Sequence, residues 1–210
     1  MVATETERHL RADAARNVER IVRAAHTAFT DDGPEVSLEE IARRAGVGIR
    51  TLYRHFPRRG DLIQAVLDQR VAEDLMPAIE RALDDDNPLH GLTTLLETAL
   101  AMVAREMNTL AAAKSTDSLT PDLSTAYFEA MTLLMHRAQQ ARLLRADLVP
   151  DDLNRILAML TRVLWSMDPK TEGWRRYLGF VLDGLSPATA TVQPPAVPGV
   201  RNPRAGSLFD

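Results

Sequence analysis

Residues 38–57 read LEEIARRAGVGIRTLYRHFP, and this stretch predicts two short helices joined by a sharp turn. Gly46 suits the turn because glycine readily takes the left-handed backbone conformation that ends a helix. Ala42 is small enough for the two helices to cross closely. Apolar contacts inside the pair are expected from Ile41, Ala45, Val47, Leu52 and Phe56. These features have the spacing of a helix-turn-helix.

The second helix of the pair, residues 48–56, is expected to have a basic outer face. Leu52 and Phe56 are four residues apart, so both point toward the first helix. The residues left facing outward are Arg50, Thr51, Arg54 and His55, with Tyr53 at the margin. Such side chains supply hydrogen-bond donors for base edges and phosphates. An ordinary helical hairpin with a polar exterior is the alternative, but it does not explain why all these features coincide. We therefore expect DNA binding.

The charge distribution agrees with this expectation, although the chain of 210 residues has a net charge of −4. Residues 1–60 hold 11 arginines and 9 acidic residues, so the excess of negative charge lies in residues 61–210. Residues 41–60 hold six arginines and no acidic residue. A short basic window on an acidic chain is typical of a local nucleic-acid contact, or of a basic helix face exposed to solvent.

Several other classes of protein are disfavoured by the sequence. There is no cysteine, which excludes disulfides and thiolate chemistry. No run approaches the 18 or so apolar residues of a membrane span, and the N-terminus lacks the apolar core of a signal peptide, so we expect a cytoplasmic protein that does not bind membranes. The five histidines are far apart, and neither HExxH, a phosphate-binding glycine loop nor GxSxG occurs. We expect no enzyme activity, no catalytic residues, no metal and no cofactor.

Apolar periodicity, proline and glycine predict an all-α fold of about nine helices. Ser37 is expected to begin the helix before the turn through a capping box, in which its hydroxyl and the Glu40 carboxylate accept from each other's backbone amides. The longer helical stretches are expected at 13–30, from 60 to about 77, and at 89–113, 121–145, 150–167 and 172–185. The predicted organisation is a flexible arm (1–12), a three-helix helix-turn-helix domain (13–59), a helical ligand-binding and dimerisation domain (60–185) and a disordered tail rich in proline (186–210).

Residues 45–57, AGVGIRTLYRHFP, followed by Arg59 and Leu62, resemble the N-terminal signature of the TetR/AcrR family of bacterial transcriptional regulators. The resemblance covers about residues 13–70. It implies that Thr51 and Tyr53 meet base edges or the DNA backbone and that His55 contacts a phosphate. It likewise implies that Arg59 contacts a phosphate from the start of the next helix, while Ser37 both caps its helix and touches the backbone.

Arg50 departs from the family pattern, since many members have glycine or another small residue at this position. An arginine there could bind guanine through two hydrogen bonds or contact a phosphate, and the sequence leaves both open.

The resemblance implies a ligand-responsive repressor that binds a palindromic operator in double-stranded DNA as a homodimer. Alternatives are regulation by a protein, no ligand at all, or activation instead of repression. The dimer interface is expected on the last two helices, whose apolar stripes could instead face their own core; the candidates are Leu157, Leu160, Leu164, Leu178, Val181 and Leu182.

The middle helices are expected, by the same resemblance, to hold a cavity for a small apolar or amphipathic effector. Candidate lining residues lie on apolar helix faces: Met102, Met107, Met131, Met135, Met159 and Trp165. Methionine adapts well to irregular ligands, although ordinary core packing is the more common role of any single one.

Overall fold

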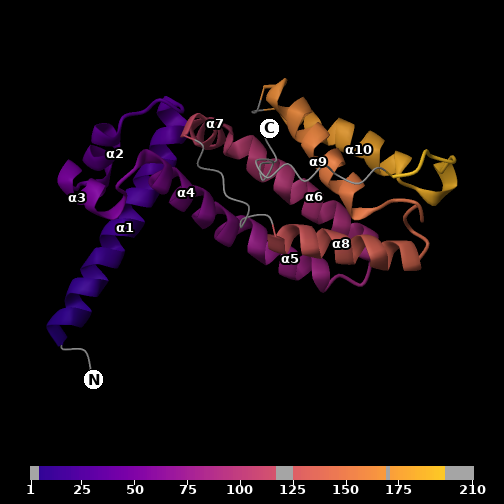
Figure 1. The fold of residues 1–210 in the computed structure, drawn as a ribbon, viewed down its shortest axis with the longest axis horizontal. Helices are drawn as coiled ribbons and strands as arrows, with labels where there is room; N and C mark the ends of the chain where they lie inside the picture. The colour runs from indigo at the N-terminus through magenta and orange to yellow at the C-terminus, as the bar shows by residue number, and fades with distance from the viewer. Residues whose placement is uncertain (1–4, 117–124, 169–170, 197–210) are drawn as a thin grey trace. The chain divides into compact units, whose positions relative to one another are not determined.

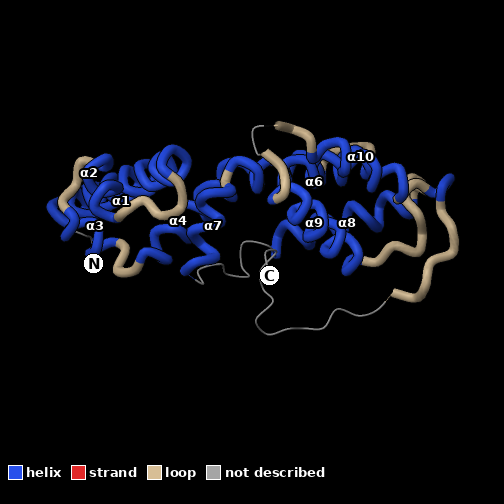
Figure 2. Tube along the Cα trace, turned by 90° about the horizontal axis from the view of Figure 1, so that it is seen from above, coloured by secondary structure: helices blue, strands red, loops and turns tan. Residues whose placement is uncertain are grey.

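The computed structural model describes residues 5–116, 125–168 and 171–196, with the side chains of residues 5–12 and of Thr189 outside that description. In these ranges the regular structure is helical, without a strand, which confirms the all-α prediction (Figure 2). Contacts divide the chain into two compact units. Unit 1 comprises residues 1–69 and 108–119, and unit 2 comprises residues 70–107 and 120–210.

Unit 1 contains α1 (Glu5–Asp32), α2 (Leu38–Ala45), α3 (Ile49–His55), α4 (Arg59–Arg70) and most of α7 (Met107–Thr116), as Figure 1 labels them. Its core is made of fully buried side chains from α1 to α4: Ile21, Phe29, Ile41, Leu52, Leu62 and Ile63. The unit therefore extends beyond the predicted boundary at residue 59, because the apolar face of α4 is part of this core. The backbone of α1 is helical from Glu5, where a flexible arm was predicted.

Unit 2 is built around α6 (Pro88–Arg105), which packs against α5 (Met76–Leu83), α8 (Thr125–Gln140), α9 (Pro150–Trp165) and α10 (Trp174–Gly184). The apolar side of α6 has no exposed surface at Leu92, Leu95, Leu96 and Leu100. At Gly91 the backbones of α5 and α6 approach so closely that a Cβ atom would lie 2.5 Å from the carbonyl oxygen of Ala82. None of the described helices is long and apolar enough to cross a membrane.

A π-helical turn, Val71–Leu75, joins α4 to α5. The N–H of Met76 donates to the carbonyl of Val71, five residues earlier. Pro77 explains this local change, because proline has no N–H to donate to Glu73 and its ring would collide with that carbonyl in a regular α-helix. The predicted helix from residue 60 thus continues past residue 77 with a wider turn in it.

Two predicted helices differ in extent from those observed. The stretch at 89–113 is divided at Glu106, a buried residue that ends α6, and α7 begins at Met107. The helix predicted at 121–145 is described from Thr125 and ends at Gln140. Arg142 takes a left-handed conformation (φ 58°), and the N–H of Leu143 donates to the carbonyl of Ala138 at 2.9 Å, which closes the helix end. The predicted start at residues 120–121 lies outside the described residues.

The beginning of the predicted disordered tail is ordered. Arg145 donates to the carbonyls of Gly184 at 3.4 Å and Thr191 at 2.9 Å, while its guanidinium also binds Asp147. These bonds hold the chain after α10, where residues 187–189 form a short 3₁₀ helix. The remainder of that prediction, residues 197–210, lies outside the described residues.

Candidate nucleic-acid interface

The turn between α2 and α3 has the predicted geometry. Gly46 takes φ 64° and ψ 36°, the left-handed conformation that a side chain would strain. The N–H of Val47 donates to the carbonyl of Ala42 at 3.0 Å, which completes the helix end. Arg20 of α1 donates to the carbonyl of Gly46 at 3.3 Å, so α1 also supports the turn.

Helix α3 divides its side chains between the core and the solvent. Leu52 and Phe56 are buried, as predicted. Arg50 and Arg54 are exposed, and Tyr53 has 45% of its surface exposed. Because residues 50, 53 and 54 are neighbours on a helix surface, they form one outward face, which we call the α3 face. Ser37 is exposed, and Thr51 and His55 are half-buried.

Ser37 caps α2, but the predicted capping box is incomplete. The Ser37 hydroxyl accepts from the N–H of Glu40 at 3.2 Å. The Glu40 carboxylate binds Arg43 at 2.6 Å and Arg44 at 2.8 Å instead of the Ser37 amide. The hydrogen bond from Arg43, and after it the one from Arg44, stabilises the ionised carboxylate and lowers the pKa of Glu40 to about 2. The carboxylate is therefore ionised at any ordinary pH.

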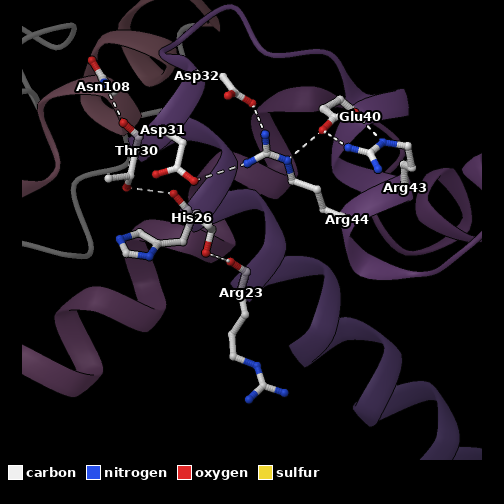
Figure 3. A network of polar contacts seen from close by, with 10 residues as sticks. Arg23, His26, Thr30, Asp31, Asp32, Glu40, Arg43, Arg44 and Asn108 are labelled. Atoms are coloured by element: carbon white, nitrogen blue, oxygen red, sulfur yellow. Dashed lines mark hydrogen bonds and ion pairs between the residues drawn. The ribbon is translucent and has the colours of Figure 1, made fainter.

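Arg44 connects α2 to the C-terminal end of α1 (Figure 3). Its guanidinium contacts Asp32 at 2.5 Å and Asp31 at 3.5 Å, on the opposite side from Glu40. Asn108 of α7 donates to the carbonyl of Thr30 at 3.4 Å, so α7 meets the same end of α1. These contacts fix the first helix of the pair on α1, and α3 is positioned through the turn that follows.

Arg59 and His55 are less available to DNA than the resemblance implies. The Arg59 guanidinium donates to the carbonyls of Pro34 at 2.5 Å and Val36 at 2.6 Å and lies 5.4 Å from the centre of the Phe29 ring. Arg59 therefore holds the loop between α1 and α2. The Nε2 atom of His55 is buried and has no hydrogen-bond partner among the described residues.

We expect Arg59→Lys to lower stability almost as much as Arg59→Ala, by about 1–2 kcal/mol, because a lysine cannot bond both carbonyls in the way the guanidinium does. Thermal unfolding measures this effect. Arg58→Ala is the matched control, since Arg58 is exposed and pairs only with Asp61 at 3.4 Å among the described residues. If Arg59→Lys retained full stability while Arg59→Ala reduced the salt dependence of DNA binding, Arg59 would be a phosphate contact.

The residues proposed for the effector do not share one environment. Met131 and Met135 are buried on one face of α8, and Met102, Met107 and Trp165 are half-buried. Met159, another predicted lining residue, has 58% of its surface exposed on α9, unlike the other five. Sequence reasoning missed Tyr127, one turn before Met131; its hydroxyl is buried without a partner among the described residues, and burial raises its pKa.

Most of the predicted dimer residues face the interior of their own chain. Leu157, Leu160, Leu164 and Leu178 are buried in unit 2, so in the single chain they pack in its own core, the alternative that the sequence left open. Val181 and Leu182 are half-buried. The exposed large apolar residues of α9 and α10 are Met159, Tyr177 and Phe180, which we call the outer apolar face. The rings of Tyr177 and Phe180 are nearly perpendicular with their centres 6.4 Å apart, and the Arg176 guanidinium lies 4.8 Å from the centre of the Phe180 ring.

The fold and the α3 face define a helix-turn-helix protein with a separate helical unit. Residues 21–66 match the sequence profile of the family described as bacterial regulatory proteins, tetR family. A TetR transcriptional regulator from Streptomyces coelicolor is 30% identical, with 81% of this chain and 98% of that one covered and a TM-score of 0.60. A TetR regulatory protein from Mycobacterium vanbaalenii is also 30% identical, with coverage of 84% and 99% and a TM-score of 0.57. The chain belongs to the TetR family of bacterial transcriptional regulators.

Other relatives are similar over less of their length or in fold alone. An HTH-type transcriptional regulator of Staphylococcus aureus is 38% identical over 77 residues, which cover 36% of this chain and 41% of that protein. The TetR-like regulator LfrR from Mycobacterium smegmatis, solved in complex with proflavine, is 22% identical, with coverage of 85% and 98% and a TM-score of 0.57. This last likeness is one of fold.

Proposed function

We propose that the protein is a non-enzymatic, ligand-responsive repressor that binds a palindromic operator in double-stranded DNA as a homodimer. The observation that carries the proposal is the α3 face, in which Arg50, Tyr53 and Arg54 are exposed while Leu52 behind them is buried. A short helix braced in this way can enter a major groove and present donors to bases and phosphates.

A homodimer is part of the proposal because one helix-turn-helix makes few base contacts. Two-fold dimers place two recognition helices about 34 Å apart, one turn of the duplex, and so read a palindrome. The outer apolar face offers apolar surface to a second copy of the chain, since Met159 and Phe180 are 58% and 56% exposed in the single chain. Large exposed apolar groups that gather on adjacent helices are typical of an interface. This face replaces the buried leucines as the proposed seam.

The proposed effector is a small, mainly apolar molecule that binds within unit 2. Met131 and Met135 lie on the same side of α8 as Tyr127, whose hydroxyl lacks a partner within the described residues. An effector with one hydrogen-bonding oxygen or nitrogen would satisfy that hydroxyl. The TetR-like regulator LfrR, which shares this fold, was solved in complex with the small molecule proflavine, and this complex supports a small-molecule effector here. The effector can shift DNA affinity only by binding two conformations unequally.

Selection of bound sequences from random duplex DNA at low ionic strength tests the proposal. We expect a palindromic sequence to be enriched, and we expect compounds from a subsequent screen to raise the melting temperature and release that DNA. A pure protein that bound no duplex at low ionic strength would contradict DNA binding. A palindrome bound without any responding compound would favour regulation by a protein or by no ligand. Whether the bound site lies where it blocks or assists transcription decides between repression and activation.

A further inference from the structure

The arginines of unit 1 fall into two groups: those that contact an acceptor within the protein, which we call engaged, and those that do not, which we call free. Most arginines whose side chains are described there contact a carboxylate or a carbonyl within 4 Å: Arg16, Arg20, Arg23, Arg43, Arg44, Arg58 and Arg59. Within the described residues, Arg50 and Arg54 have no such partner. Both are exposed on α3. The window around them, residues 41–60, contains no acidic residue either.

The two free arginines occupy different ends of a short helix. Arg50 is the second residue of α3 and Arg54 is the sixth. They are one turn apart, so they share the α3 face and are separated by about 6 Å along the helix axis. In a helix-turn-helix the N-terminal residues of the recognition helix meet base edges. Gly48 precedes α3 and is exposed, and a Cβ atom there would meet nothing within 4 Å, so the chain leaves this end of the helix open.

We propose that Arg50 reads a guanine in each operator half-site by donating two hydrogen bonds to its O6 and N7 atoms, while Arg54 contacts a phosphate. This inference rests on the proposed function and assigns the base chemistry of the operator. The planar guanidinium matches the two acceptors of guanine in the major groove, and a free guanidinium breaks no internal bond when it binds. The engaged arginines would each have to give up a contact within the protein.

The test compares Arg50→Ala, Arg50→Lys and Arg54→Ala on the sequence selected by the wild-type protein. We expect Arg50→Ala to lose about 10- to 100-fold of the preference for guanine at one position of each half-site. The slope of log K against log salt should change little, because a base contact releases no phosphate counterion. Arg50→Lys should fail to restore the preference, since an ammonium cannot form the planar pair of bonds.

Arg54→Ala is the matched control on the same exposed face. It should weaken binding to all sequences alike and reduce the salt slope by about 2 for a dimer, one unit for each half-site. Circular dichroism and thermal unfolding of the three variants should match the wild type, since neither arginine has a hydrogen-bond or ion-pair partner in the described part of the chain.

Operator DNA that carries 7-deazaguanine at the selected position tests whether Arg50 contacts the base or a phosphate. This base lacks the N7 acceptor, so it should weaken wild-type binding and leave Arg50→Ala unaffected. The inference is overturned if the selected half-site contains no guanine, if the modified base binds wild type normally, or if Arg50→Ala lowers the salt slope as Arg54→Ala does. Each of these results leaves DNA binding itself intact, whereas failure to bind any duplex would overturn the proposed function as well.

Discussion

Met159→Glu combined with Phe180→Glu is expected to convert the homodimer into a folded monomer. Both side chains lie on the outer apolar face and are more than half exposed, so the substitutions cost little within one chain. In a dimer formed through this face, each carboxylate would be removed from water in place of an apolar contact, at a cost of several kcal/mol. We expect the dimer association constant to fall by at least about 1,000-fold. Sedimentation velocity measures the change.

The same double variant should bind the operator poorly although its α3 face is unaltered. A dimer binds its second half-site as an intramolecular step, and the loss of that advantage reduces affinity by about 100- to 10,000-fold. Fluorescence anisotropy with operator DNA tests this expectation. The monomer should retain weak, strongly salt-dependent binding, because its arginines still meet phosphates.

Leu133→Glu and Leu160→Glu are the controls for this experiment. Leu133 is 43% exposed on α8, outside the outer apolar face, so its variant should remain dimeric. Leu160 is buried in unit 2, so its variant should lose helical structure and melt early instead of forming a folded monomer. A double Met159 and Phe180 variant that sediments as a dimer would show that the seam lies elsewhere.

The helix-turn-helix could be predicted from the sequence because its constraints are local. Gly46 must take the left-handed turn, Ala42 must be small, and Leu52 must point inward, all within a dozen residues. The inner and outer sides of α3 follow from helical spacing alone. The structure accordingly places Arg50 and Arg54 outside and Leu52 inside, as the periodicity indicates.

The burial of the leucines that were predicted at the dimer interface could not be foreseen, because periodicity shows that a helix face is apolar and does not show what covers it. Leu157, Leu160 and Leu164 form one stripe, and Met159 lies on the opposite side of the same helix. Periodicity identifies the leucine stripe and does not say whether α6 or a second copy of the chain covers it. That choice depends on tertiary packing between elements about 60 residues apart, which no local pattern records.

The partners of Arg59 could not be predicted from the sequence either. Its position after α3 suggests a phosphate contact, and its donors are visible in the sequence. Its acceptors are the backbone carbonyls of Pro34 and Val36, more than 20 residues earlier, and backbone groups carry no sequence signal. Arg59 therefore has partners that fix it within the fold, whereas Arg50 has none among the described residues and stays available to a ligand.

Gly91→Ala is expected to destabilise unit 2 by about 2–3 kcal/mol, despite the higher helix propensity of alanine. The added Cβ atom would lie 2.5 Å from the carbonyl oxygen of Ala82 and 3.2 Å from Cδ2 of Leu134. The oxygen belongs to the backbone of α5, so relief requires α5 to move away from α6 along their whole contact. For a chain of this size the melting temperature should fall by about 5–10 °C, measured by calorimetry at fixed protein concentration.

Gly179→Ala in α10 provides the comparison that isolates the effect of close packing. A Cβ atom at Gly179 would meet nothing within 4 Å, so only helix propensity acts there. This variant should be unchanged or more stable by up to about 1 kcal/mol. If Gly91→Ala left the stability unchanged or raised it, that result would contradict the close packing of α5 against α6 at this position. If Gly91→Ala lowers the stability and Gly179→Ala does not, the missing side chain at Gly91 is what allows the α5 backbone to pack directly against α6 in the core of unit 2.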